Sequence, residues 1–202
     1  MFAAEHVRSD ERHGDVIVRG AVINTESFDT LPPPIWTLAN YSGNYFWTSN
    51  VSLRRSRLDA AGGRFDDSFS EYGWEDIELG MRLRALHTKG VLNKRALAFH
   101  YKPRPSGTNV AGMLRQVRAQ ARTAVQLEQK HPHWRVALAI GNTAPQRMLG
   151  DAFHKSGIAR RIESLAGPGE GDRKLGFVQL VLANLLATDA YYDELAKAQR
   201  AP

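Results

Sequence analysis

The chain of 202 residues contains no cysteine, which excludes disulfide bonds and thiolate metal sites. It also lacks a long apolar run: the longest, residues 175–187, is interrupted by Gln179 and Asn184 and falls short of the ~20 residues that a bilayer-spanning helix requires. Residues 1–6 do not resemble a signal peptide, because charge arrives before an apolar segment can form. We therefore expect a cytoplasmic location, with a peripheral membrane contact left open.

Acidic residues are fewer than basic ones: 21 Asp and Glu stand against 27 Lys and Arg, a formal net charge of +6 with a pI near 9.8. This surplus favours anionic partners such as sugar nucleotides, phospholipid head groups or nucleic acids. No zinc-finger or RNA-recognition signature is present, and the aromatic residues cluster with carboxylates, which would repel phosphates. A nucleic-acid-binding module is therefore the least favoured function, and we expect no nucleic-acid partner.

The first half of the chain alternates between helix and strand patterns. Residues 3–13 predict a helix, residues 15–23 a β-branched strand, and residues 24–45, which contain three consecutive prolines, a long loop. Residues 46–54 predict a strand with one apolar and one polar face, and residues 56–61 a short helix that ends at two glycines.

The pattern then becomes mainly helical. Residues 74–89 predict a helix that is apolar on two sides, as in a helix packed between two layers, and residues 96–101 predict a strand. Beyond residue 105 the spacing of apolar residues predicts helices over 109–130, 148–165 and 175–199, with a glycine-rich flexible linker at 167–171.

Several short motifs follow one another between residues 44 and 103. In order, they are Asn50-Val51-Ser52, Gly62-Gly63-Arg64-Phe65-Asp66, Tyr72-Gly73-Trp74-Glu75-Asp76, Glu78-Leu79-Gly80-Met81-Arg82-Leu83 and, further on, His100. Their order and spacing resemble the second half of family 2 glycosyltransferases and the related galactosyltransferase C-terminal region. The resemblance covers about a third of the chain.

This resemblance implies an α/β fold in which residues 1–105 form the C-terminal half of a GT-A (Rossmann-like) catalytic domain, followed by an α-helical extension over residues 106–202. It implies an inverting glycosyltransferase that moves a hexose or N-acetylhexosamine from a nucleotide-sugar, expected to be UDP-linked, to a glycan or lipid-linked acceptor. The alternative is a non-catalytic glycan-binding or regulatory remnant of such an enzyme.

The resemblance assigns the catalytic base to Asp76, which would accept the proton of the attacking acceptor hydroxyl. Glu75 points about 100° away around the predicted helix and is better placed to bind acceptor hydroxyls. The other interpretation is that these two acidic residues only complement the positive end of the helix dipole.

By the same resemblance, His100 coordinates a divalent cation, Mn²⁺ or Mg²⁺, that bridges the phosphates of the donor. Its alternative role is that of a strand histidine bonded to the backbone. The family's other metal ligands lie in an Asp-x-Asp motif, and none occurs in this sequence. We therefore expect that the nucleotide-binding half lies upstream of this segment.

Four residues are candidates for substrate binding. Tyr72 and Trp74 offer flat rings on which a sugar can stack, although Trp74 is equally well spaced to be core. Asn50 and Ser52 lie on the polar face of the predicted strand. They could bind acceptor hydroxyls, or they could only form hydrogen bonds within the protein around that strand.

Other charged residues have simpler interpretations. Arg82 is spaced to pair with Glu78 on the helix surface. A stripe of arginines on the helix at 109–130 is better explained as a solvated face than as a lipid contact: Arg115, Arg118 and Arg122. The histidines other than His100 have no metal-ligand spacing, and we assign them no function.

Overall fold

The computed structural model describes residues 2–34, 46–103, 109–166 and 175–200. The chain divides into two compact units, one of Met1–Asp67 and Glu75–Pro103, the other of Ser68–Trp74 and Arg104–Pro202. The domain boundary that we placed between residues 105 and 106 lies outside the described residues, as do the linker at 167–171 and residues 35–45 of the predicted loop at 24–45.

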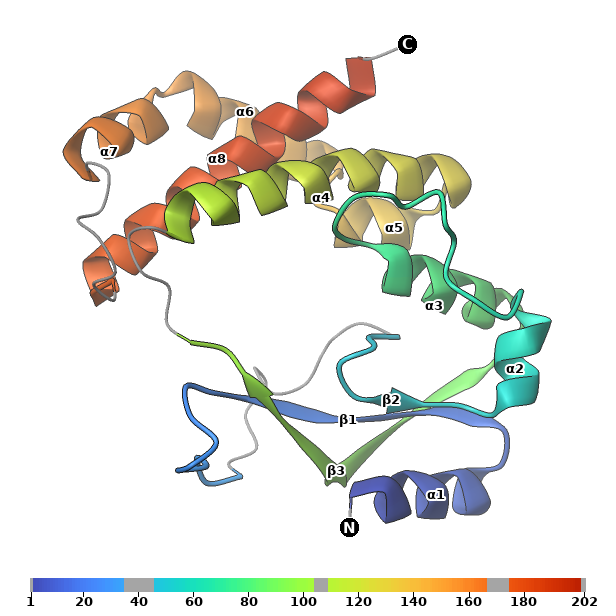
Figure 1. Ribbon diagram of the computed structural model, residues 1–202. Helices are drawn as coiled ribbons and strands as arrows, with labels where there is room; N and C mark the ends of the chain where they lie inside the picture. The colour runs from blue at the N-terminus through green and yellow to red at the C-terminus, as the bar shows by residue number, and fades with distance from the viewer. Residues whose placement is uncertain (1, 35–45, 104–108, 167–174, 201–202) are drawn as a thin grey trace. The chain divides into compact units, whose positions relative to one another are not determined.

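The first unit is a small three-stranded sheet with helices on both faces (Figure 1). The sheet order is β2-β1-β3, with β1 antiparallel to β2 and parallel to β3. Helix α1 covers one face, and α3 packs on the other. The elements are α1 (Phe2–His13), β1 (Val16–Thr25), β2 (Val51–Ser52), α2 (Arg55–Ala60), α3 (Glu75–Ala85) and β3 (Lys89–Tyr101).

The core of this unit forms where α3 meets β1. Ile17 of β1 packs with Leu79 and Leu83 of α3, together with Phe46 and Ala61, and all five are buried. Gly80 lies so close to Phe46 that a Cβ there would meet its side chain at 2.7 Å. The burial of Ile77 as well confirms that α3 is a helix enclosed on more than one side.

The predicted strand over residues 46–54 is wrong in extent, since only Val51 and Ser52 pair with β1. Residues 46–50 form a turn in which Phe46 is buried while Trp47 is 45% exposed. The packed face that we predicted forms only in part: Val51 and Leu53 pack against the core, whereas Trp47 does not. Before Val51, core contacts of Phe46 and hydrogen bonds of Asn50 replace strand pairing.

The predicted helix over residues 74–89 ends four residues early, at Ala85. His87 adopts a left-handed φ of +55°, and β3 then begins at Lys89, well before the strand that we predicted. Parallel pairing with β1 recruits residues 89–93 into the strand. The register changes between Gly20, opposite Asn93, and Ala21, opposite Leu97, and β3 bends sharply in its middle (Figure 1).

The second unit consists of the loop Ser68–Trp74 and a set of helices, among which α8 contacts α4, α6 and α7. The predicted helix at 148–165 is two helices, separated where Gly157 adopts a φ of +68°, and the first begins earlier than predicted. Helix α5 was not predicted. The helices are α4 (Val110–Lys130), α5 (Trp134–Ala139), α6 (Ala144–Lys155), α7 (Ile158–Ala166) and α8 (Phe177–Arg200).

Within the described ranges, none of the helices is both long enough and apolar enough to cross a bilayer.

Candidate functional site

The two candidate catalytic residues stand in the first turn of α3. The chain enters this helix through two residues with left-handed backbone, Gly73 at a φ of +110° and Trp74 at +70°. Because Trp74 has a side chain, this conformation costs on the order of 1–3 kcal/mol and requires support from its surroundings. Support comes from within the second unit, to which Tyr72 and Trp74 belong: the Trp74 indole N–H donates to the Gln120 carbonyl at 2.8 Å, and Thr123 Oγ1 donates to the Tyr72 carbonyl at 3.2 Å.

Asp76 is half-buried, and its burial raises the pKa of its carboxyl group above the usual value. The nearby charge of Glu75 adds to this rise, while backbone hydrogen bonds from Thr48 and Ile77 oppose it. The net rise in pKa makes Asp76 a stronger base than an exposed aspartate. The contact with Thr48 also joins the start of α3 to the turn that precedes β2.

Glu75 has a buried carboxylate oxygen, Oε2, that accepts no hydrogen bond from the part of the protein that the structure describes. Leaving a buried polar group unsatisfied costs about 1–3 kcal/mol, and more when the group is charged. A hydroxyl of a bound ligand would satisfy this oxygen.

Asn50 and Ser52 meet at a buried histidine. His6 of α1 is only 5% exposed, and its Nε2 and Nδ1 lie 2.8 Å from Asn50 Oδ1 and 2.8 Å from Ser52 Oγ. Asn50 Nδ2 donates to the carbonyls of Ala21 at 2.8 Å and Ala96 at 2.9 Å. Both the oxygen and the nitrogen of the Asn50 side-chain amide thus have partners inside the protein. This favours a structural role for Asn50 over the binding of acceptor hydroxyls.

The hydrogen bonds around His6 also define its tautomer. The two carbonyls orient the amide nitrogen of Asn50 away from His6, so its Oδ1 can only accept from the imidazole. Nε2 therefore carries the hydrogen, and in the neutral ring Nδ1 accepts from the Ser52 hydroxyl. We did not predict this role for His6. The sequence holds only a weak signal for it, the spacing of three residues that places His6 and Ser9 on one side of α1, where both are buried.

His100 lies near the carboxyl end of β3, opposite Asn24 of β1, with its side chain exposed. Ligands commonly bind at the carboxyl ends of parallel strands. Among the residues that the structure describes, however, no group of three or more His, Asp or Glu side chains is arranged to hold a metal. His100 can supply a single nitrogen ligand, so a complete cation site is not formed by these residues.

The candidate sugar-stacking residues differ in how accessible they are. Tyr72 is 58% exposed, so its ring is free to meet a ligand. Trp74 is half-buried and its N–H is already bonded. Both belong to the second unit, and their role in binding stays a prediction.

The ion pair between Arg82 and Glu78 is confirmed, with 2.8 Å between Arg82 Nη2 and Glu78 Oε2. It is not a surface pair as predicted, since the Glu78 residue is only 3% exposed. Arg82 also donates to the carbonyls of Ala61 and Arg64. Arg82 of α3 therefore connects the helix to the segment around Gly62 and Gly63.

The arginine stripe on α4 is not uniformly solvated. Arg122 pairs with Glu71 at 2.5 Å and with Glu194 of α8 at 2.7 Å. Arg115 and Arg118 are exposed. Arg122 thus joins three segments of the second unit rather than standing free for a lipid.

Comparison with known proteins finds a short local similarity to glycosyltransferases. The validoxylamine A glucosyltransferases of Streptomyces hygroscopicus subsp. jinggangensis (strain 5008) and of subsp. limoneus are each 54% identical to this chain over 41 residues, 20% of its length. The match spans only 10% and 9% of those relatives. No protein-family model matches the chain. No solved structure matches it either.

Proposed function

We propose that this chain carries the acceptor-binding and base-bearing part of an inverting glycosyltransferase of the GT-A, family 2 type. The observation that carries the proposal is the first turn of α3, where Asp76 has a raised pKa beside an unsatisfied oxygen of Glu75. The ordered motifs around α3 and the local similarity to two glucosyltransferases support it. A hexose is accordingly the donor sugar that we propose.

Asp76 acts in this proposal as the general base. As the acceptor hydroxyl oxygen attacks the anomeric carbon of the donor, its proton passes to the Asp76 carboxylate. The bond between the anomeric carbon and the phosphate oxygen breaks on the opposite side, so the configuration inverts and a nucleoside diphosphate leaves. The raised pKa of Asp76 favours this proton transfer.

Glu75 positions the acceptor rather than sharing the proton. Its buried Oε2 would accept a hydrogen bond from a second hydroxyl of the acceptor, which is a glycan or a lipid-linked sugar in this proposal. Tyr72 and Trp74, three residues and one residue before Glu75 in the sequence, remain the proposed sugar-stacking residues.

A divalent cation, Mn²⁺ or Mg²⁺, would offset the charge that builds on the departing diphosphate of a UDP-linked donor. His100 would provide one nitrogen ligand for it at the carboxyl end of β3. The remaining ligands would have to come from outside the described residues, the donor phosphates included.

The alternative is a non-catalytic, glycan-binding remnant. The observation that favours it is the missing cluster of metal ligands in the described part of the chain. Such a protein would bind a glycan at the start of α3 without releasing a nucleotide.

The test is release of UDP from UDP-glucose in the presence of Mn²⁺, measured on the longest form of the protein that the gene encodes. Validoxylamine A, which gives the two relatives their name, is the first acceptor to try. Asp76→Asn should lower turnover by ~10²–10⁴. Asp67→Asn, the same change at an exposed carboxylate, serves as the control.

Asp76→Asn turnover close to that of the wild type would exclude Asp76 as the base. Saturable glycan binding without any nucleotide release by the wild type would instead support the remnant.

A further inference from the structure

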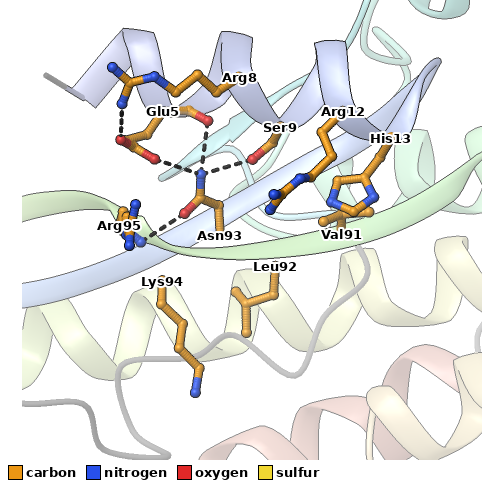
Figure 2. A pocket seen from close by; sticks show the side chains of 10 residues that line it. All are labelled: Glu5, Arg8, Ser9, Arg12, His13, Val91, Leu92, Asn93, Lys94 and Arg95. Carbon is orange, nitrogen blue, oxygen red and sulfur yellow. Dashed lines mark hydrogen bonds and ion pairs between the residues drawn. The ribbon is translucent and has the colours of Figure 1, made fainter.

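A groove of about 640 Å³ lies between α1 and β3 in the first unit (Figure 2). This volume is within the range typical of small-molecule sites, ~300–1,000 Å³. Its walls come from the side of α1 that faces β3 and from the middle of β3, where the strand leaves its register with β1. Because α1 and α3 cover opposite faces of the sheet, the groove is separate from Asp76.

The lining of this groove is strongly basic. Arg8, Arg12, Lys94 and Arg95 line it together with one carboxylate, that of Glu5. That carboxylate is already engaged, since it pairs with Arg8 and accepts from Asn93 Nδ2 at 3.3 Å. These contacts, first Asn93 and then Arg8, hold the pKa of Glu5 below its usual value. The Glu5 carboxylate therefore stays charged, and its charge is compensated mainly by Arg8.

Two of these cations are not held in an ion pair by the described residues, although the charge of Arg95 contributes, after Asn93 and Arg8, to the lowered pKa of Glu5. Arg12 of α1 and Arg95 of β3 are both exposed and form no ion pair there. Figure 2 shows the side chains of Arg12 and His13 pointing from α1 toward β3, whereas Lys94 and Leu92 point away from α1. Arg12 from α1 and Arg95 from β3 therefore supply cations to the groove, and His13 adds a further polar nitrogen.

The floor of the groove is held rigidly by Asn93. Its Nδ2 donates to the Glu5 carbonyl at 2.8 Å and to Ser9 Oγ at 2.8 Å, and its Oδ1 accepts from the Arg95 backbone N–H at 2.8 Å. These bonds tie α1 to β3 and shape the backbone at Arg95 as the strand leaves its register. A bulge of this kind re-aims the side chains that it carries.

We propose that the groove between α1 and β3 binds the phosphate group of a small molecule, either a phosphate monoester or a diphosphate. Guanidinium groups bind phosphate through paired, charge-assisted hydrogen bonds, and two guanidinium groups from different elements can hold one dianionic group between them. The ligand neutralises the unpaired charges of Arg12 and Arg95. This site does not depend on the glycosyltransferase proposal, because none of its residues belongs to the site at the start of α3.

The first experiment is calorimetric titration of the 202-residue chain with inorganic pyrophosphate. Arg12→Gln and Arg95→Gln should each weaken binding about tenfold, since each removes one charge-assisted contact. The control is the double variant R115Q/R118Q, which removes two exposed charges from α4, outside the groove. Thermal unfolding of each variant shows that the fold is retained.

Three results decide the proposal. Saturable binding that the groove variants weaken and the control leaves within about twofold supports it. Equal weakening by the control shows non-specific attraction to a basic protein and overturns it. Absence of saturable binding up to about 10 mM pyrophosphate also overturns it.

The source of the phosphate is then resolved with two further probes. UDP that binds more tightly than pyrophosphate indicates a soluble nucleotide. Co-sedimentation with vesicles of phosphatidylcholine and phosphatidic acid, lost in R12Q/R95Q and retained in R115Q/R118Q, indicates a lipid head group. Pyrophosphate binding alone, with neither preference, assigns the groove to a free phosphate compound.

Discussion

His6 Nε2 lies 2.8 Å from Asn50 Oδ1, and each of these residues is only 5% exposed. The contact joins α1 to the turn before β2, two segments separated by 44 residues in the sequence. Asn50 also donates to two carbonyls, one in β1 and one in β3, so its side chain connects α1 to both of these strands.

Asn50→Ala should therefore destabilise the protein by ~3 kcal/mol or more, because two carbonyls and one imidazole N–H lose their partner at about 1–3 kcal/mol each. Urea unfolding followed by circular dichroism measures the loss. Ser52→Ala, which removes one hydrogen bond, should cost about 1 kcal/mol. If Asn50→Ala were as stable as the wild type but bound the acceptor more weakly, Asn50 would instead have a substrate-binding role.

Gly20→Ala should be at least as damaging. A Cβ at Gly20 would overlap the Ala96 carbonyl oxygen and the amide of Asn50, and a backbone atom cannot move aside cheaply. We expect a loss of more than about 3 kcal/mol, comparable to severe core substitutions. The control is Gly112→Ala in α4, where only a flexible arginine end lies within 4 Å and the substitution should stabilise the helix by ~0.5–1 kcal/mol. A well-folded Gly20→Ala variant would contradict the close packing at this junction.

The pH dependence of transfer should reflect Asp76. A base must be deprotonated to act, so kcat/KM should fall as pH decreases through the raised pKa of Asp76. The acid limb of the profile should consequently lie above the pH at which an ordinary aspartate titrates. Rate measurements across the acid range test this, and an acid limb at the usual aspartate value would count against burial of the base.

The same shift has an opposite consequence for stability. A raised pKa in the folded state means that folding favours the protonated carboxyl, so this contribution is complete below the unfolded-state pKa and is lost as pH rises through the folded-state pKa. At neutral pH, Asp76→Asn should leave the free energy of unfolding unchanged or increase it. A clear loss of stability in this variant would indicate that the Asp76 charge has a structural role.

Arg82→Met should destabilise the first unit strongly. It leaves the buried Glu78 carboxylate without its arginine and also removes hydrogen bonds to Ala61 and Arg64. Breaking one side of a buried pair costs about 3–5 kcal/mol, whereas Lys197→Met at the exposed pair with Asp193 should cost less than about 1 kcal/mol. Adding Glu78→Gln to Arg82→Met should recover part of the loss, and chemical unfolding of the single and double variants shows whether it does.

Local patterns were sufficient for elements whose stabilising contacts lie close in the chain. The helices at α1, α4 and α8 and the strand β1 were predicted from spacing, because a regular apolar period reports directly on the face that is buried. The acidic first turn of α3 was visible in the same way. The predicted Arg82–Glu78 pair was confirmed because its two residues are one helical turn apart.

Contacts between distant segments decided the rest. The early start of β3 depends on its pairing with β1, and the short β2 depends on the burial of Phe46 and Asn50. Neither the pairing nor the burial can be predicted from the residues adjacent in the sequence. The histidine beside Asn50 and the basic groove between α1 and β3 arise only when distant chain segments meet. His6 and Asn50 are 44 residues apart in the sequence, and Glu5 and Asn93 are 88 residues apart. The sequence by itself determined which residues could do chemistry and which helices and strands would form locally. Only the tertiary structure decided which of those polar groups are consumed by internal hydrogen bonds and which remain for a ligand, because desolvation and partnering are properties of the packed chain.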